Sequence, residues 1–320
     1  MTLHKNASLQ QFEQRRLEGA YPDLQQLIGL HRSCQQLKLS SLGRLRHSAA
    51  GERQTRRRGR GMEFEEVRPY QPGDDIRSID WRVTARTQTP HTKLYREEQE
   101  RPVLLAADLR SSMFFGSQTC FKSVLCANLM SALGWITLAN RDRIGGIIFG
   151  DQSHCELRPK RSKHRVLEWI RQLQQFAQQL DSPCPEQPPQ PLYSLLQKLL
   201  PICRPGSGLY IASDFHDLDE RCYRLLYQLS RHADLTLFVL YDPLERQLPA
   251  TEGLWVTDGQ HRQPLSTALT QQTLIEDRLE ALQHRCQPLG VRVLSLGTDE
   301  PLLARLNTFY GSRKSNGARP

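Results

Sequence analysis

The chain has 320 residues, of which 38% are hydrophobic and 24% are charged, a composition that suits one large soluble domain or two. The longest apolar run free of charge, 124–139, includes Asn128 and stops short of 18 residues, and the N-terminus lacks the apolar core of a signal peptide. The eight cysteines form no CxxC pair, which predicts reduced packing residues and no disulfide network. The sequence therefore predicts a cytoplasmic protein without a membrane segment.

Residues 1–60 carry most of the net charge of +9, because they hold 12 Lys and Arg against 4 Asp and Glu. Apolar residues between 21 and 46 recur at helical spacing, which predicts one or two amphipathic helices that pack on the body. The densest arginine run, 53–60, contains no aromatic residue for base stacking and precedes several glutamates that can pair with it. We expect a solvated or internally paired segment, and binding of nucleic acid or anionic lipid is the alternative.

Residues 59–98 form the most distinctive part of the sequence. Residues 63–70 alternate loosely, which predicts a strand, and Pro72-Gly73 fits a type II turn. Arginines then interleave with acids, a density that suits a carboxylate–guanidinium network clamping this segment to the next domain better than it suits catalysis. The expected members of this network are Glu63, Arg68, Asp74, Asp75, Arg77, Asp80, Trp81, Arg86 and Glu97.

Patterns of buried strands and of helices alternate from residue 103 to 296, which predicts an α/β fold with a mostly parallel sheet. We expect strands at 103–107, 144–149, 209–213, 235–241 and 291–296. We expect helices at 120–140, 163–180, 192–203, 219–232 and 267–287. We also expect a Pro-rich loop at 181–191, a hairpin with a type I′ turn at Asp258-Gly259, and a disordered tail after Tyr310.

Two of the expected buried strands end at a carboxylate. Asp108 ends the first of them and is followed by Arg110 and Ser112, and Asp214 ends the strand at 209–213. Because the carboxyl ends of parallel strands meet at one edge of a sheet, we expect these side chains to lie close together. We predict that Asp108, Arg110, Ser112 and Asp214 form a corner that binds a partner protein.

Residues 55–150 closely resemble the bacterial family called "domain of unknown function 58". The residues that carry the resemblance are, in order, Glu63-Phe64, Arg68, Tyr70, Gly73-Asp74-Asp75, Arg77, Ile79-Asp80-Trp81, Ala85-Arg86, Glu97, Asp108 to Met113 and Asp142 to Gly145. The resemblance implies a von Willebrand factor A-like domain with an N-terminal β extension. It also implies a MoxR-type AAA+ ATPase as a partner and a role in maturing, or inserting metal into, a client complex.

The domains expected on these grounds are a basic helical arm at 1–52, the β extension at 53–100, the von Willebrand factor A-like domain at 101–310 and a tail at 311–320. In von Willebrand factor A domains the corner carries Asp-x-Ser-x-Ser and holds a divalent cation. Here Arg110 replaces the first Ser, and the Thr expected before residue 192 is absent. We expect Arg110 to pair with Asp108 or Asp214, and no metal or other cofactor to bind. Binding of Mg²⁺ by Asp108, Ser112 and Asp214 is the alternative.

Other constellations typical of enzymes are missing from the sequence. It has no GxGxxG or GxxxxGK[ST] phosphate loop, no HExxH and no Gly-x-Ser-x-Gly elbow. We therefore predict a non-enzymatic cytoplasmic adaptor that docks to a MoxR-type ATPase and serves a client complex. The alternatives are a Mg²⁺-dependent adhesion-type binding module and a nucleic-acid-associated protein that uses the Arg-rich arm.

Overall fold

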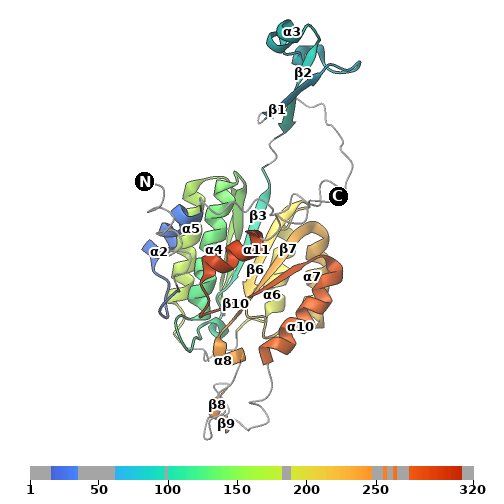
Figure 1. Ribbon diagram of the computed structural model, residues 1–320. Coiled ribbons are helices and arrows are strands. Elements are labelled where there is room, and N and C mark those ends of the chain that lie inside the picture. Colours follow the sequence, from blue (N-terminus) through green and yellow to red (C-terminus); the bar gives the residue numbers. More distant parts are fainter. Residues whose placement is uncertain are drawn as a thin grey trace. The chain divides into compact units, whose positions relative to one another are not determined.

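The computed structural model describes residues 16–34, 62–97, 100–181, 189–246, 255–257, 262–264 and 274–311 (Figure 1). The chain divides into two compact units. Residues 1–45 and 101–320 form one unit, which we call the body, and residues 46–100 form the other, which we call the β extension. The segment 35–61, which includes the arginine run at 53–60, lies outside the described residues.

A six-stranded sheet forms the centre of the body, in the order β10-β7-β6-β3-β4-β5. Its strands are β3 Pro102–Asp108, β4 Arg143–Phe149, β5 His154–Lys160, β6 Ser207–Ser213, β7 Ala233–Tyr241 and β10 Arg292–Gly297. All neighbours pair in parallel except β5, which pairs antiparallel with β4 at one edge. The predicted α/β class with a mostly parallel open sheet is confirmed.

Helices cover both faces of this sheet (Figure 1). One face packs on α2 Leu24–Cys34, α4 Lys122–Ala139, α5 Lys163–Gln178 and α11 Leu302–Gly311. The other packs on α6 Leu192–Ile202, α7 Glu220–His232 and α10 Leu274–Cys286. Side chains alternate between the two layers along β3, so that Val103 and Leu105 belong to the first core cluster and Leu104 and Ala106 to the second. Central strands buried on both faces explain the continuous apolar runs.

Among the described residues, α4 is the one helix that is long and apolar enough to cross a membrane. It lies inside the body, where 16 of its 18 residues are buried. Two tryptophans bond α4 to the neighbouring helices. Trp135 Nε1 on α4 donates to the carbonyl oxygen of Leu27 on α2 at 3.1 Å, and Trp169 Nε1 on α5 donates to the carbonyl oxygen of Met130 on α4 at 3.3 Å. α4 is therefore the central helix of this layer.

Most of the predicted elements are present, and several differ in length. The expected helix at 267–287 is described as α10 from Leu274, and residues 265–273 lie outside the described range. The expected two-residue turn at Asp258-Gly259 is wrong, because β8 Trp255–Thr257 and β9 Arg262–Pro264 pair Thr257 with Arg262 and leave four residues between them. β5 and α11 were not predicted, and residues 312–320 of the expected tail lie outside the described range.

The cysteines agree with the prediction as far as the structure describes them. Seven thiols are free, and six of these are buried, the exception being Cys155. Burial raises the pKa of Cys34 and of Cys120 to about 12, so both remain protonated at neutral pH. These residues behave as small apolar packing groups.

The β extension is built on a hairpin of β1 Met62–Pro69 and β2 His91–Glu97, paired antiparallel. Between them lie the short 3-10 helix η1 Ile76–Ser78 and the helix α3 Trp81–Thr87, which was not predicted. The amide of Asp80 donates to the carbonyl oxygen of His91 at 2.8 Å, and the amide of His91 donates to Thr84 Oγ1 at 3.0 Å. These bonds hold α3 against the hairpin.

Candidate functional site

The carboxyl ends of β3 and β6 meet where the sheet changes its winding direction. The chain continues from β3 to its neighbour β4 on one side and later returns to β6 on the other. Asp108 is the last residue of β3, and Asp214 directly follows β6. Open α/β sheets bind ligands at such a switch point. We call the side chains gathered there the rim: Asp108, Arg110, Lys122, Ser213, Asp214, His216, Asp217, Asp242 and Glu245.

Arg110 is enclosed in the rim and uses all five of its N–H groups. Its side chain is 1% exposed, and the facing carboxylate of Asp108 is 0% exposed. Nε and Nη2 donate to the two oxygens of Asp108 at 3.0 and 2.8 Å, a bidentate pair. Nη1 and Nη2 donate to Asp217 at 2.8 and 3.0 Å, and Nη1 also donates to the carbonyl oxygen of Gln190 at 2.9 Å. The predicted pair with Asp108 is confirmed, and the second carboxylate is Asp217 instead of Asp214.

Lys122, the first residue of α4, supplies a second buried cation. Its side chain is 2% exposed, and Nζ donates to Asp214 Oδ2 at 3.1 Å and to Glu245 Oε1 at 2.8 Å. The ring of Phe115 lies 5.8 Å from the ammonium group. Lys122 thus links the end of β6 to the short helix α8 Pro243–Arg246, which follows β7.

The turn after β6 connects these two ion pairs. Ser213 Oγ donates to Asp108 Oδ2 at 2.6 Å and accepts the amide of Phe215 at 3.0 Å. Phe215 is buried and has a φ of 50°, a left-handed conformation that is uncommon for a bulky residue and marks a tightly constrained turn. The turn brings His216 Nδ1 to 2.9 Å from Asp214 Oδ1 and to 3.9 Å from Asp217 Oδ1.

Asp242 closes the far side of the rim after β7. Its oxygens accept the hydroxyl groups of Ser117 and Thr298, the latter at 2.7 Å, and the amides of Ser117 and Leu244 at 2.9 and 3.0 Å. Glu245 Oε2 accepts the amide of Asp242 at 2.8 Å, so hydrogen bonds connect Asp214, Lys122, Glu245 and Asp242. The rim thus consists of two hydrogen-bonded groups, one around Arg110 and one around Lys122, which approach each other where His216 Nδ1 lies 3.9 Å from Asp217 Oδ1.

The shifts in pKa fix the charges of the rim. Burial alone would lower the pKa of Arg110 and of Lys122, but the neighbouring carboxylates outweigh it and raise both. Burial alone would raise the pKa of Asp214, but Lys122 and the hydrogen bond from His216 hold it well below its usual range. His216 is only partly enclosed: desolvation lowers its pKa, but the hydrogen bond and charge of Asp214 outweigh that effect and raise the pKa from 6.5. It is the rim group closest to a change of charge at neutral pH.

The donor set of the rim does not fit a divalent cation. Mg²⁺ requires near-octahedral oxygen ligands, most of them without competing cationic partners. The carboxylate of Asp108 accepts hydrogen bonds from Arg110 and Ser213, and the carboxylate of Asp214 accepts hydrogen bonds from Lys122 and His216. Ser112 Oγ is enclosed and makes no hydrogen bond. Two protein cations therefore occupy the carboxylates that a metal would need, and no group of three potential metal ligands exists among the described residues.

Sequence reasoning found part of this site. It placed Asp108, Arg110, Ser112 and Asp214 at one corner, and the structure brings them together. It missed Lys122, Ser213, Asp217 and Glu245, which supply most of the partners. Two features of the sequence could have indicated them: Lys122 is a lysine at the start of an apolar helix, and Asp217 is a carboxylate three residues after Asp214. A direct contact between this corner and a partner stays a prediction, and the structure directs Arg110, Asp108 and Asp214 into the chain.

The network expected in the β extension is only partly present. Arg68 Nη2 pairs with Asp74 Oδ1 at 2.8 Å. Asp75 and Asp80 instead cap the short helices, since they accept the amides of Arg77 and Arg82, each at 3.0 Å. The guanidinium groups of Arg77 and Arg86 pair with no described residue, and Trp81 is 68% exposed. Adjacent backbone amides compete for these carboxylates, which explains the difference. The side chains of Glu63 and Glu97 lie outside the described set.

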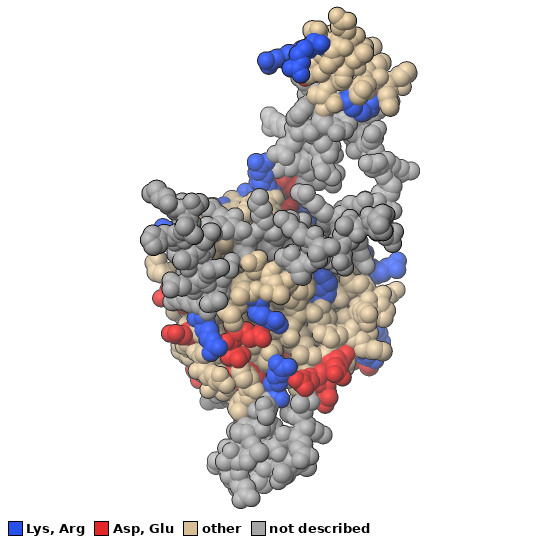
Figure 2. Space-filling view, in the orientation of Figure 1, with Lys and Arg blue, Asp and Glu red and all other residues tan. Residues whose placement is uncertain are grey.

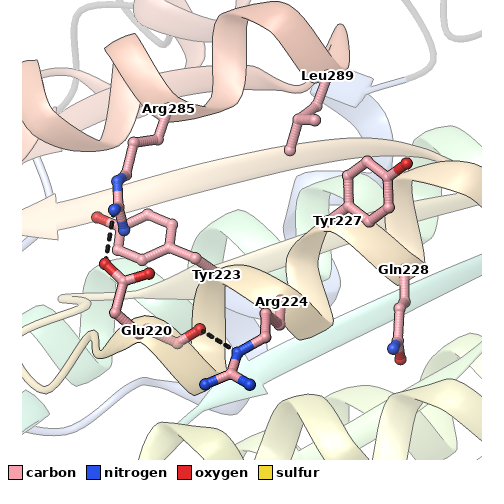
Figure 3. Close-up of a pocket in the computed structure, with 7 residues that line it drawn as sticks. All are labelled: Glu220, Tyr223, Arg224, Tyr227, Gln228, Arg285 and Leu289. Carbon is pink, nitrogen blue, oxygen red and sulfur yellow. Dashed lines mark hydrogen bonds and ion pairs between the residues drawn. The ribbon is translucent and has the colours of Figure 1, made fainter.

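A shallow groove of about 360 Å³ lies on the body between α7 and the end of α10 with η3 Gln287–Leu289 (Figure 3). Arg285 spans one end of it, paired with Glu220 at 2.5 Å and stacked 4.2 Å from the ring centre of Tyr223. Tyr227 is 49% exposed. No rim residue lines this groove. Charges of both signs are mixed over the visible face of the body (Figure 2).

The fold and the rim define an α/β protein in which Arg110 and Lys122 occupy the carboxylates at the carboxyl ends of the parallel strands. The model of the family described as "Protein of unknown function DUF58" matches residues 66–286, and the chain belongs to this family. It is 28% identical over 266 residues to uncharacterized proteins of Mycobacterium tuberculosis (strain ATCC 25618 / H37Rv) and Mycobacterium bovis (strain ATCC BAA-935 / AF2122/97), covering 80% of this chain and 81% of each relative.

Two solved structures are similar to the chain. One is the SpRpn10 VWA domain, with a TM-score of 0.38, 11% identity, and coverage of 69% of this chain and 100% of that one. The other is an uncharacterized membrane-spanning protein from Vibrio fischeri, with a TM-score of 0.22, 15% identity, and coverage of 68% and 100%.

Proposed function

We propose that this protein is a non-enzymatic adaptor that docks to a MoxR-type AAA+ ATPase and assists the maturation of, or metal insertion into, a client complex. The observation that carries the proposal is the filled rim. At the edge where α/β sheets bind small molecules, Arg110 already bonds two carboxylates and Lys122 bonds two others. A rim with fixed charges and no free ligand set favours protein recognition over chemistry.

A general acid or base needs a pKa near the working pH and access to the reacting proton. Arg110, Lys122 and Asp214 have pKa values shifted away from neutrality, so none of them is suited to proton transfer. His216 is 38% exposed, but its imidazole is bonded to Asp214, and the hydroxyl group of the rim serine, Ser213, is buried and donates to Asp108. These features support the non-enzymatic assignment.

The ATPase assignment follows from membership of the family and from the partner that the resemblance implied. Purified full-length chain and the MoxR-type ATPase of the same organism test it by sedimentation velocity, with ATP, with ADP and without nucleotide. We expect a complex whose affinity depends on the nucleotide. Two species that sediment independently at about 50 μM in all three conditions would contradict the proposal, because that concentration exceeds the Kd of ordinary specific complexes.

We also propose a cytoplasmic location. The burial of α4 in the body and the seven free thiols support it, since disulfides are rare in the reducing cytoplasm. Fractionation of native cells tests this: the protein is expected in the supernatant after ultracentrifugation, and recovery in detergent extracts of the membrane pellet would contradict it.

A further inference from the structure

The stretch 76–86 of the β extension exposes apolar side chains to an unusual degree. Trp81 is 68% exposed and Ile76 is 64% exposed, more than any other large hydrophobic residue in the described part of the chain. The unit has little core of its own: among its described side chains, Thr92 alone is buried. An exposed tryptophan and isoleucine are costly to leave in water, which points to an interaction surface.

Three arginines belong to the same stretch, and no described residue uses the donors of their side chains. The guanidinium groups of Arg77, Arg82 and Arg86 are exposed and form no hydrogen bond or ion pair with any described residue. The nearby carboxylates of Asp75 and Asp80 are engaged as caps by backbone amides. Figure 2 shows blue Lys and Arg atoms on the face of this unit. We call Ile76, Arg77, Trp81, Arg82, Ala85 and Arg86 the Trp81 surface.

The backbone that carries this surface is held in place before any partner binds. A helix of seven residues is too short to be stable alone. Asp80 caps α3, a β-bridge joins Ile79 to Thr92, and Gln88 ends the helix in a left-handed conformation with its amide bonded to Thr84. A preorganised surface loses less conformational freedom on binding, so its contacts contribute more fully to affinity.

We propose that the Trp81 surface docks an acidic protein partner. Tryptophan and arginine are among the residues most enriched in binding hot spots, and three guanidinium groups that pair with no described residue call for carboxylates opposite them. A nucleic acid fits less well, because the surface offers one aromatic ring, Trp81, and its other large apolar side chain is the aliphatic Ile76, whereas single strands stack on successive aromatics. The identity of the partner as an AAA+ ATPase rests on the proposed function. The acidic character of the partner rests on the surface itself.

Photo-crosslinking of the full-length chain in native cells tests this proposal. Trp81→p-benzoylphenylalanine places the probe in the surface, and Tyr227→p-benzoylphenylalanine, at an exposed tyrosine of the body, is the matched control. We expect the probe at 81 to capture one defined protein in trans, identified by mass spectrometry, with an acidic patch at the crosslinked site. We expect the Tyr227 probe not to capture it. The pair Arg82→Glu and Arg86→Glu should abolish this crosslink, while Arg171→Glu, at an exposed position on α5, should leave it intact.

The outcomes separate the two proposals. Capture of a MoxR-type ATPase supports both, and capture of a different acidic protein supports the surface but overturns the assignment of the ATPase. Capture of residues 101–320 of the same chain, of a second copy or of RNA overturns the docking proposal, as does the absence of any crosslink. With the captured protein purified, Trp81→Ala should weaken its affinity roughly 30-fold or more while the melting temperature stays unchanged. An affinity within about threefold of wild type would also overturn it.

Discussion

The rim of the body and the stretch 74–86, which carries the Trp81 surface, both combine arginine with carboxylates, and they differ in how the guanidinium groups are used. In the rim, Arg110 is 1% exposed and donates five hydrogen bonds within the chain. On the Trp81 surface, Arg77, Arg82 and Arg86 are exposed, and their guanidinium groups donate none to described residues. Similar residue types therefore stabilise the fold in one region and remain available in the other.

The difference has a geometric origin. Strands β3 and β6 bring the carboxylate of Asp108 and the loop before α6 to the same edge of the sheet, so one guanidinium group reaches two carboxylates and a carbonyl oxygen at once. In the β extension, the carboxylates lie at helix N-termini, where backbone amides bind them first. Interleaved charges in a sequence thus do not distinguish a buried network from a recognition surface.

The largest expected effect comes from breaking the rim at Arg110. Arg110→Met should lower the free energy of unfolding by about 3–5 kcal/mol, because it leaves the carboxylate of Asp108 buried without its cation. Urea unfolding at neutral pH measures this. Arg171→Met, on the exposed face of α5, is the control and should stay within about 0.5 kcal/mol of wild type. Equal small losses in the two variants would mean that the rim is not a buried network.

Lys122 tests the other half of the rim. Lys122→Met should cost about 3 kcal/mol, at the lower end of the same range because His216 still donates to Asp214. Lys163, which opens α5 as Lys122 opens α4 but is exposed, gives the matched variant Lys163→Met. That variant should unfold like the wild type in the same urea titration. A loss in Lys163→Met as large as in Lys122→Met would assign the effect to the helix N-terminus instead of the ion pair.

Much of the fold was predictable because local sequence dictates it. Apolar runs such as 103–107 have no polar alternation, so they indicate strands buried on both faces, and each ends at the polar residue that leaves the core. The edge strand β5 was missed because its burial alternates and its residues His154–Lys160 are mostly polar. α3 was missed because seven residues carry too little periodicity to reveal a helix.

The site was predictable only where one strand defines it. Asp108 and Asp214 follow directly from the ends of their strands. Lys122 and Asp217 could not be assigned, because a lysine or an aspartate at a helix start or in a loop is solvated in most proteins. The burial of Lys122 and the pairing of Asp217 depend on tertiary packing, which brings together residues about 90 to 110 positions apart in the sequence.

Two variants in the β extension test whether Asp80 caps α3 or forms an ion pair with Arg77. Asp80→Ala should lower the free energy of opening of α3 by about 1 kcal/mol, because it removes the cap on the amides of Arg82 and Val83. Arg77→Ala should change it by less than about 0.5 kcal/mol, because the guanidinium group is exposed and pairs with no described residue. Amide hydrogen exchange across 81–87 measures both. A loss in Arg77→Ala equal to that in Asp80→Ala would indicate an ion pair between them.

The smallest expected effect is the pH dependence contributed by His216. The hydrogen bond and charge of Asp214, together with the charge of Asp217, raise its pKa above 6.5, against the effects of burial and of Arg110. A raised pKa in the folded state means that the stabilisation is complete below pH 6.5 and is lost as the pH rises through the folded-state value. The side chain is 38% exposed, so solvent screening limits the contribution to a fraction of about 1 kcal/mol.

His216→Gln should therefore destabilise the protein more at about pH 5.5 than at about pH 8.5, measured as the difference from wild type in urea unfolding at each pH. His164→Gln, on the exposed start of α5, controls for general effects of losing an imidazole. In the background of Asp214→Asn, the pH dependence of the His216→Gln effect should shrink, because the principal carboxylate partner is gone. If the two histidine variants show the same pH dependence, the imidazole of His216 is not coupled to the rim.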